Sequence, residues 1–243
     1  MSLHVLLIAT AVCSLALGLS ITAPAQEAGK KEAAKAAPVR PGLFFSEGWK
    51  QQTKLSFQAP MTQEFVSNPN LELKIYGGAP DKGATILFTQ HDAAEPPHGW
   101  NGMCNPTCAA ALHDRNNYVD LTGLARIGYQ TFVNGFHQVR PVIKVADGTW
   151  LVGDKAMGTS SEYHFTEFLV QDIKWKKLDI AHVLEANDGR WVTPDLSRVD
   201  EIGWVDLTPG NGHGQGGWAG VGKVEVYGKA VARSGAAQTG VGK

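Results

Sequence analysis

The sequence predicts an all-β fold, a jelly-roll β-sandwich, and three observations support this prediction. Short segments rich in β-branched and aromatic residues recur between residues 43 and 229. Clusters of Gly, Pro, Asn and Asp separate these segments, as turns do between strands. No stretch of the chain carries the long apolar repeat of 3.6 residues that an amphipathic helix requires. Many short strands joined by turns are typical of β-sandwiches and jelly rolls.

Nine segments carry the strand pattern, and we expect each to form one strand. In chain order they are residues 71–76, 85–89, 125–133, 136–145, 150–152, 163–169, 174–179, 201–206 and 223–227. Two short helical turns are also predicted, one over residues 109–114 (AAALHD) and one near residues 179–185.

The dipeptide Asn134-Gly135 predicts a two-residue hairpin turn between two of these strands, because a type I′ turn needs positive φ at both positions. The resulting register places side chains of the two strands on a shared face, which we expect to be polar and aromatic, like surfaces that recognise sugars. An ordinary solvated face is the alternative. The outward residues are Tyr129, Thr131, Gln138, Arg140 and Lys144. The core-facing residues are Leu124, Phe132, Val139, Ile143 and Val145, with Arg126 and Gln130 as polar exceptions.

Both ends of the chain are predicted to lie outside this domain. Residues 5–21 form an apolar run followed by Ala23-Pro24-Ala25, so residues 1–25 are predicted to be a secretory signal peptide, with a retained membrane anchor as the alternative. Residues 26–42 are predicted to be a linker, residues 43–229 the β-sandwich domain, and residues 230–243 a disordered tail. We therefore expect a secreted or periplasmic protein whose mature chain has no membrane span.

The charge balance limits the partners of the protein. The chain has 22 Lys and Arg against 23 Asp and Glu, a formal net charge of -1. A surface that neutralises phosphates needs a basic excess, so nucleic acid is not an expected partner.

The order of several segments resembles a known group of folds. The stretch DLTGLARIGYQTFVNGFHQVRPVIKVADGTW is followed by KWKKLDI, then by PDLSRVDEIGWVDLTPGNGHGQGGW and VGKVEVYG. This pattern resembles the galactose-binding-domain-like jelly rolls, which include many carbohydrate-binding modules and the complex I intermediate-associated protein 30 group. The resemblance covers about residues 121–228 and implies a fold but no catalytic residue. Concanavalin-like sandwiches, including the 3-keto-glycoside hydrolase family, are a second possibility, although their usual Leu-Phe-Asn-Gly-Lys opening is missing.

Residues 91–123 are predicted to form a long functional loop, because most connections run roughly 4–6 residues. The loop is rich in His and Asp, which could bind a metal ion or supply acid–base chemistry. The third alternative is that these residues only cap turns, since no standard metal or catalytic spacing is present. The metal candidates are His91, Asp92, His98 and His113. The acid–base candidates are His91, His98, His113, Asp114 and His213. No motif requires a cofactor, and a structural calcium ion would be compatible with a secreted jelly roll.

Two cysteines of this loop, Cys104 and Cys108, are predicted to form a disulfide in an oxidising compartment. The bond would close a very small loop and would stiffen it locally. Two ligands of a zinc site are the alternative, although the spacing matches no standard zinc signature.

The leading functional prediction is non-covalent binding of a carbohydrate, such as a cell-wall polysaccharide. Flat aromatic rings cover the apolar face of a pyranose, and two tryptophans lie in Gly-rich stretches, whereas Trp175 and Trp204 have strand patterns typical of core residues. A glycan-active hydrolase or lyase and an envelope-associated structural protein are the alternatives. The predicted binding residues are Trp100, Tyr129, Gln138, Arg140 and Trp218.

Overall fold

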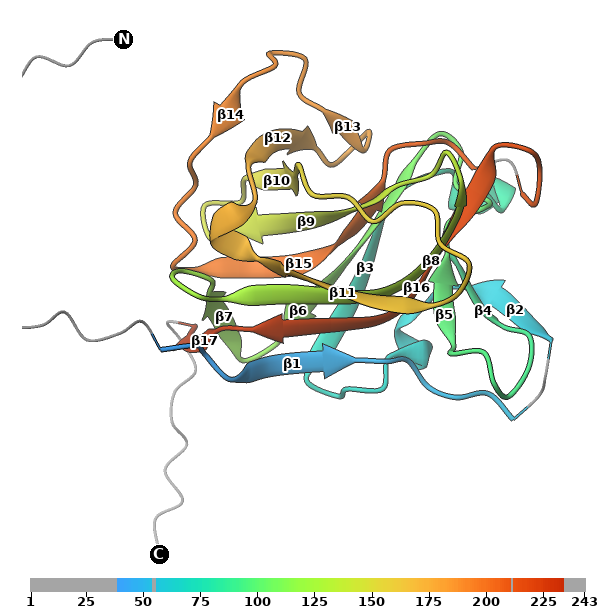
Figure 1. Ribbon diagram of the computed structural model, residues 1–243, viewed down its shortest axis with the longest axis horizontal. Helices are drawn as coiled ribbons and strands as arrows, with labels where there is room; N and C mark the ends of the chain where they lie inside the picture. Colours follow the sequence, from blue (N-terminus) through green and yellow to red (C-terminus); the bar gives the residue numbers. More distant parts are fainter. Residues whose placement is uncertain (1–38, 54–55, 211, 234–243) are drawn as a thin grey trace, which may run out of the picture. The chain divides into compact units, whose positions relative to one another are not determined.

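A computed structural model describes residues 39–53, 56–210 and 212–233, and these residues belong to one compact unit. They form a sandwich of two antiparallel β-sheets, which confirms the predicted all-β fold (Figure 1). The predicted signal peptide, residues 26–38 of the predicted linker and residues 234–243 of the predicted tail lie outside the described residues. Among the helical segments that are described, none is long and apolar enough to cross a membrane.

We call the first sheet sheet A. Its strand order is β11 (His164–Leu169), β8 (Arg126–Gly135), β16 (Gly217–Tyr227), β5 (His98–Trp100), β4 (Leu87–Gln90) and β2 (Phe57–Pro60). The long strand β16 has two neighbours on one side. It pairs with β5 through Gly220 and Val221, and with β1 (Leu43–Glu47) through Val224–Tyr227.

We call the second sheet sheet B. Its strand order is β13 (Leu184–Glu185), β12 (Trp175–Asp179), β10 (Trp150–Gly153), β9 (Val139–Val145), β15 (Val199–Asp206), β6 (Cys108–Asp114) and β3 (Leu71–Gly77). Three further short strands join it: β14 (Trp191–Val192) pairs with β12, while β7 (Asn117–Asp120) pairs with β15 and β17 (Lys229–Ala232). Three 3-10 turns complete the described structure, η1 (Gln63–Phe65), η2 (Pro80–Lys82) and η3 (Val170–Asp172).

The core lies between the inner faces of the two sheets. Alternate residues of β8 point inward, and Tyr129 is fully buried there with its hydroxyl donating to the carbonyl of Gly203 on sheet B, 2.7 Å away. Trp204 of β15 packs against Trp49 with ring centroids 5.8 Å apart. Trp175 and Trp204 are both buried, as the sequence predicted. Each large side chain buried in this way contributes about 1.5–3 kcal/mol to folding.

The predicted hairpin at Asn134-Gly135 is wrong. Strands β8 and β9 lie in different sheets, so the chain crosses from sheet A to sheet B after Gly135. Tyr129 pairs with Thr166 and Val224, and Arg140 pairs with Val205, so the two never face each other. Because successive side chains of a strand point to opposite faces, losing this register also reverses the predicted faces of β8.

The predicted long loop over residues 91–123 is not one continuous loop, because three strands interrupt it. It contains β5, β6 and β7, and the stretch predicted as a helical turn, AAALHD, belongs to β6 between β15 and β3. The helix propensity of alanine is a weak preference that tertiary pairing overrides. At the other end of the domain, β17 continues the fold to Ala232, beyond the predicted boundary at Lys229.

Candidate functional site

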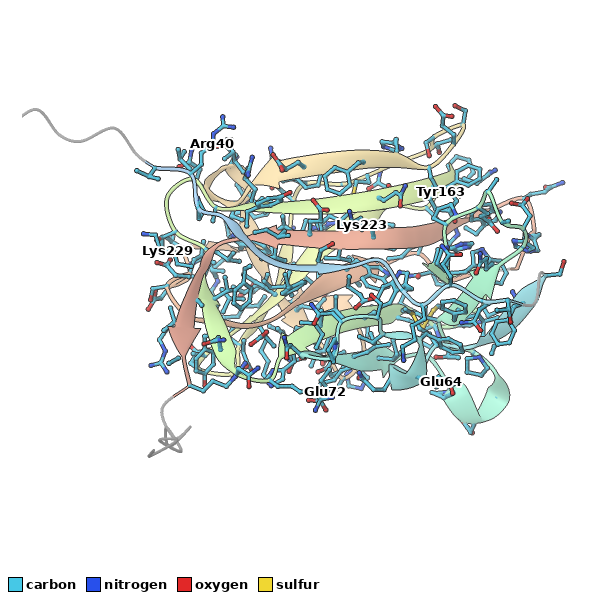
Figure 2. All side chains as sticks on the ribbon, turned by 90° about the horizontal axis from the view of Figure 1, so that it is seen from below. Arg40, Glu64, Glu72, Tyr163, Lys223 and Lys229 are labelled. Carbon is cyan, nitrogen blue, oxygen red and sulfur yellow. A yellow bond between two sulfur atoms is a disulfide. The ribbon has the colours of Figure 1, made fainter. Side chains whose placement is uncertain are left out.

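The candidate site lies on the outer face of sheet A. On β8, Ile127, Tyr129 and Val133 belong to the core, so the alternate residues Arg126, Gln130 and Phe132 point away from it. Figure 2 shows the same sheet with Lys223 on β16 lying between Tyr163 and Arg40. Most of the outer side chains are half-buried or exposed.

A row of aromatic rings crosses one end of this face, and we call it the aromatic row. Its members, in spatial order, are His213, Trp100, Trp218, Phe132, Tyr163, His98 and His91. His213 stacks on Trp100 with centroids 4.8 Å apart, and Trp218 meets Phe132 edge-on, also at 4.8 Å. Phe132 and Tyr163 follow at 5.4 Å. Edge-to-face and offset contacts at these separations hold the rings in defined orientations.

An open hollow of about 590 Å³ lies beside the part of this row that runs from Phe132 to His91, and we call it the aromatic hollow. Its size falls within the range of small-molecule sites. Phe132 and Tyr163 supply the aromatic wall. The polar lining residues are His91, Asp92, Glu95, Gln130 and Glu162. Apolar rings and several hydrogen-bonding groups therefore meet in one concave surface.

The floor beside this hollow depends on a glycine of β16. A Cβ atom on Gly220 would lie 2.9 Å from the Tyr163 hydroxyl and 3.0 Å from Cδ2 of His98. The missing side chain lets Tyr163 and His98 lie directly against the sheet. The Tyr163 hydroxyl is buried and has no hydrogen-bond partner among the described residues, and burial raises its pKa, so the phenol stays neutral.

Two histidines near the hollow differ in their exposure to solvent. His91 is exposed, and its Nδ1 lies 2.9 Å from Oε2 of Glu95. His98 is buried, and its Nδ1 lies 3.0 Å from the carbonyl oxygen of Pro96, which identifies Nδ1 as the protonated nitrogen. Burial lowers the pKa of His98, so its imidazole is neutral at neutral pH.

The structure brings together six of the residues predicted as site residues and shows how exposed the two tryptophans among them are. His91, His98, Trp100, Trp218 and His213 all belong to the aromatic row, and Asp92 lines the hollow. Trp218 is half-buried, but Trp100 is only 4% exposed because His213 lies on its ring. Trp100 is therefore a support of the surface rather than the exposed platform that the sequence predicted.

Three predicted binding residues lie elsewhere. Tyr129 is in the core, and Gln138 is exposed just before β9. Arg140 lies on the outer face of sheet B, where it pairs with Glu185 and donates from Nε to the carbonyl of Gly153 at 2.7 Å. The prediction of a shared platform for these residues is wrong because it depended on the hairpin register.

His113 and Asp114 also lie away from the aromatic hollow, on β6 of sheet B. His113 Nδ1 lies 3.3 Å from Asp200, and with Glu201 these are the described side chains whose possible metal ligands come within 4.8 Å of one another. Lys144 Nζ lies 3.2 Å from Asp200 and 3.0 Å from Glu201, so a cation of the chain already occupies this group. Asp114 caps a turn by accepting from the amides of Asn116 and Asn117. The four predicted metal ligands are therefore not brought together.

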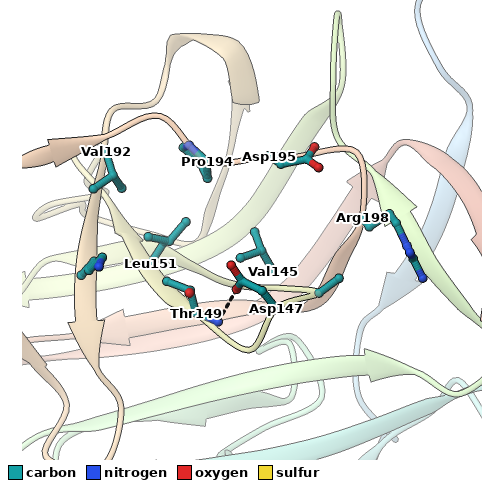
Figure 3. A pocket seen from close by; sticks show the side chains of 10 residues that line it. Val145, Asp147, Thr149, Leu151, Val192, Pro194, Asp195 and Arg198 are labelled. Carbon is teal, nitrogen blue, oxygen red and sulfur yellow. Dashed lines mark hydrogen bonds between the residues drawn. The ribbon is translucent and has the colours of Figure 1, made fainter.

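A second hollow, of about 430 Å³, lies beside the turn between β9 and β10 (Figure 3). Val145, Leu151 and Val192 give it an apolar floor. The carboxylate of Asp147 accepts from the amide of Thr149 at 2.8 Å, and that of Asp195 accepts from Ser197 at 2.9 Å. These carboxylates serve local turns, and no aromatic ring lines this hollow.

The disulfide Cys104–Cys108 is present and joins the residues before β6 to its first residue. Both cysteines are buried. The structure thus confirms the local brace and leaves no pair of thiolates for zinc.

Several residues of the hollow were missed by the sequence prediction. They are Glu95, Gln130, Phe132, Glu162 and Tyr163. A signal was present: Arg126 and Gln130 were polar exceptions on the face assigned to the core. Reversing that face would have turned both exceptions, together with Phe132, toward solvent.

No family model and no curated protein matches this chain. Among solved structures, it is similar to a family 11 carbohydrate-binding module from Clostridium thermocellum, solved with a beta-1,3-1,4-mixed-linked tetrasaccharide. The sequence identity is 13%, the TM-score is 0.37, and the match covers 77% of this chain and 98% of the module. A likeness at this level says nothing about the ligand of this chain.

Proposed function

We propose that this protein binds carbohydrate non-covalently through the outer face of sheet A. The observation that carries the proposal is the aromatic row, which borders a hollow lined by carboxylate, amide and imidazole groups. A pyranose ring has an apolar face and a rim of hydroxyl groups. It therefore needs an aromatic surface beside several hydrogen-bonding side chains, and the hollow supplies both.

Phe132 and Tyr163 are the rings available to the sugar, since both line the hollow. Gln130 offers a donor and an acceptor, and Glu162 offers two acceptor oxygens. Hydrogen bonds from sugar hydroxyls to a carboxylate are stronger than those between neutral groups. Glu95 is partly engaged with His91, so it orients that imidazole as well as facing the hollow.

Part of this surface is carried by paired strands. Gln130 and Phe132 lie on β8, which pairs on both sides with β11 and β16. The backbone at these two positions is therefore ordered before binding, so only side-chain rotamers have to be fixed, which favours affinity.

The ligand class proposed is a glycan or polysaccharide outside the cytoplasm. The signal peptide expected at residues 1–25 supports a secreted or periplasmic location. The disulfide fits the same assignment, because such bonds persist in oxidising compartments.

The test is a binding screen of the purified protein against soluble glycans by affinity electrophoresis, followed by calorimetry on any positive ligand. Phe132→Ala removes an aromatic wall, and we expect about tenfold weaker binding from the loss of one stacked ring. Trp191→Ala is the matched control, since Trp191 is 50% exposed but lies on β14 of sheet B. Equal affinities of wild type and Phe132→Ala would contradict the proposal.

A second candidate function is chemistry on the bound glycan. The pair His91–Glu95, at 2.9 Å, is an imidazole held by a carboxylate at the edge of the hollow, which is the arrangement of an oriented general base. Release of reducing ends or unsaturated products, lost in His91→Gln while binding persists, would favour a hydrolase or lyase over a binding protein.

A further inference from the structure

A third hollow, of about 380 Å³, lies farther along the outer face of sheet A, and we call it the basic hollow. Its cations come from three separate segments: Arg40 before β1, Arg126 at the start of β8, and Lys155 after β10. Two carboxylates, Glu167 and Asp172, also line it. The cations therefore outnumber the acids.

Only part of this positive charge is neutralised. Arg126 contacts Glu167 at 3.2 Å, and its guanidinium lies 4.3 Å from the ring centroid of Tyr227. The buried Nε of Arg126 has no hydrogen-bond partner within the described residues. This nitrogen is shielded from solvent, but the Arg126 side chain as a whole is 17% exposed, so other nitrogens of its guanidinium can meet a ligand in the hollow. Arg40 is exposed, and neither Arg40 nor Lys155 forms an ion pair with another residue in the described ranges.

The two hollows lie at different positions along the same strand, β8. Gln130 lines the aromatic hollow and Arg126 lines the basic hollow, and both point outward from the same strand. Four residues of an extended strand span ~13 Å, which is the length of a short oligosaccharide. Figure 2 shows the corresponding separation, with Tyr163 toward one end of the face and Arg40 toward the other.

An exposed aromatic ring lies between the hollows. Phe165 of β11 is 46% exposed and pairs with Gln130, and its ring lies over Gly128. A Cβ on Gly128 would lie 2.3 Å from the ring. Gly128 sits midway between Gln130 and Arg126, so Phe165 offers a stacking surface to a unit that joins the two hollows.

The charges of the two hollows differ in sign. Asp92, Glu95 and Glu162 line the aromatic hollow, and they would repel an anionic sugar. We propose that the ligand is an acidic polysaccharide, with a neutral unit in the aromatic hollow and an anionic group, carboxylate or sulfate ester, in the basic hollow. This inference depends on the proposed glycan binding and adds the ligand class.

The experiment compares matched polymers by affinity electrophoresis and calorimetry at low and high salt. One pair is glucuronoxylan and the same polymer after reduction of its carboxyl groups; the other is a sulfated galactan and its desulfated form. We expect the intact acidic polymer of at least one pair to bind about three- to tenfold more tightly at low salt, with the preference shrinking as salt rises. The pair that shows the preference identifies the anion as carboxylate or sulfate.

The double variant Arg40→Gln/Lys155→Gln should lose this preference and keep the affinity for the neutral polymer. Arg190→Gln/Lys229→Gln is the control matched in charge, since it also removes one Arg and one Lys, both of them exposed and outside the basic hollow. Arg126→Gln tests the third cation of the basic hollow and should also weaken the preference for the acidic polymer, with a thermal melt to verify folding.

The outcomes separate the two proposals. If neither acidic polymer is preferred, or if the preference survives in Arg40→Gln/Lys155→Gln, the acidic ligand is excluded, while loss of binding in Phe132→Ala would still support glycan binding. If Phe132→Ala leaves the affinity for the acidic polymer unchanged but Arg40→Gln/Lys155→Gln lowers it, a ligand that spans both hollows is excluded.

Discussion

The outer faces of the two sheets contain similar residue types and differ in how these residues are satisfied. On sheet B, the fully buried Glu201 accepts from the Tyr76 hydroxyl at 2.7 Å, Lys74 at 3.1 Å and Lys144 at 3.0 Å. On sheet A, aromatic rings and carboxylates surround an open hollow. Sheet A also carries ion pairs, Arg126–Glu167 and Lys223–Glu225, but its hollow is open to a ligand, whereas the paired charges of sheet B stabilise the fold.

A segment of the chain also covers part of sheet B. Val183, fully buried, packs with Leu178 and Trp150 onto the small residues Ala109 and Ala111. Val183 adopts φ 53°, which is strained for a β-branched residue, so the burial of its side chain holds this conformation. This apolar cluster covers part of the outer face of sheet B.

Among the variants that test this contrast, we expect the largest loss of stability at Glu201. Glu201→Ala leaves Lys74, Lys144 and the Tyr76 hydroxyl without their shared acceptor, and we expect about 3–5 kcal/mol of lost stability. Urea unfolding measures this loss. Glycan affinity of the folded fraction should not change, and a reduced affinity would show that the two faces are coupled.

The next effect is expected from the disulfide, which braces the start of β6. Because the closed loop is very short, we expect the double variant Cys104→Ser/Cys108→Ser to lose about 2 kcal/mol of stability. Glycan binding should persist, since neither cysteine lines the aromatic hollow. A variant that fails to fold would show a larger role than local bracing.

A smaller effect is expected at the glycine beneath the aromatic row. Gly220→Ala places a methyl group 2.9 Å from the Tyr163 hydroxyl, so the ring must shift, and we expect binding to weaken severalfold. Gly158→Ala is the control, because no atom lies within 4 Å of the added methyl. Equal affinities of the two variants would argue against a wall formed by Tyr163.

The smallest expected effect is the pH dependence contributed by His98. Burial lowers its folded pKa below the usual 6.5, so the unfolded chain binds this proton more readily than the folded chain. The stability that the neutral imidazole contributes is present above about pH 6.5 and is lost as pH falls toward the folded pKa. Urea unfolding between pH 5 and 8 should show a shallower acid loss in His98→Gln than in wild type; identical slopes would contradict this assignment.

The sequence predicted the positions of the strands better than their pairing. Strand segments such as residues 71–76 and 201–206 were identified because their apolar pattern is local, and β3 and β15 contain them. The pairing of β8 was not predictable from Asn134-Gly135, because that dipeptide here precedes a crossing between sheets. A turn signal reports local backbone preference and not which strand comes next in the sheet.

The sequence identified several residues of the candidate site but not the aromatic residues that line its hollow. His91, His98, Trp100, Trp218 and His213 were all identified as candidates, and tertiary pairing of β5 with β16 brings them together. Phe132 and Tyr163 were not, because an aromatic residue in a strand pattern has the same local sequence whether it faces core or solvent. His113, like His98, is a histidine of the predicted loop. It lies on sheet B because the chain passes from sheet A to sheet B between β5 and β6.

The most direct test of the contrast between the two faces is a map of the bound glycan by amide chemical-shift perturbation. The account predicts shifts concentrated on sheet A, at Gly99, Gln130, Phe132, Tyr163 and the indole of Trp218. Shifts concentrated instead on sheet B, at Ala111, Val142 and Trp150, with sheet A unchanged, would contradict it.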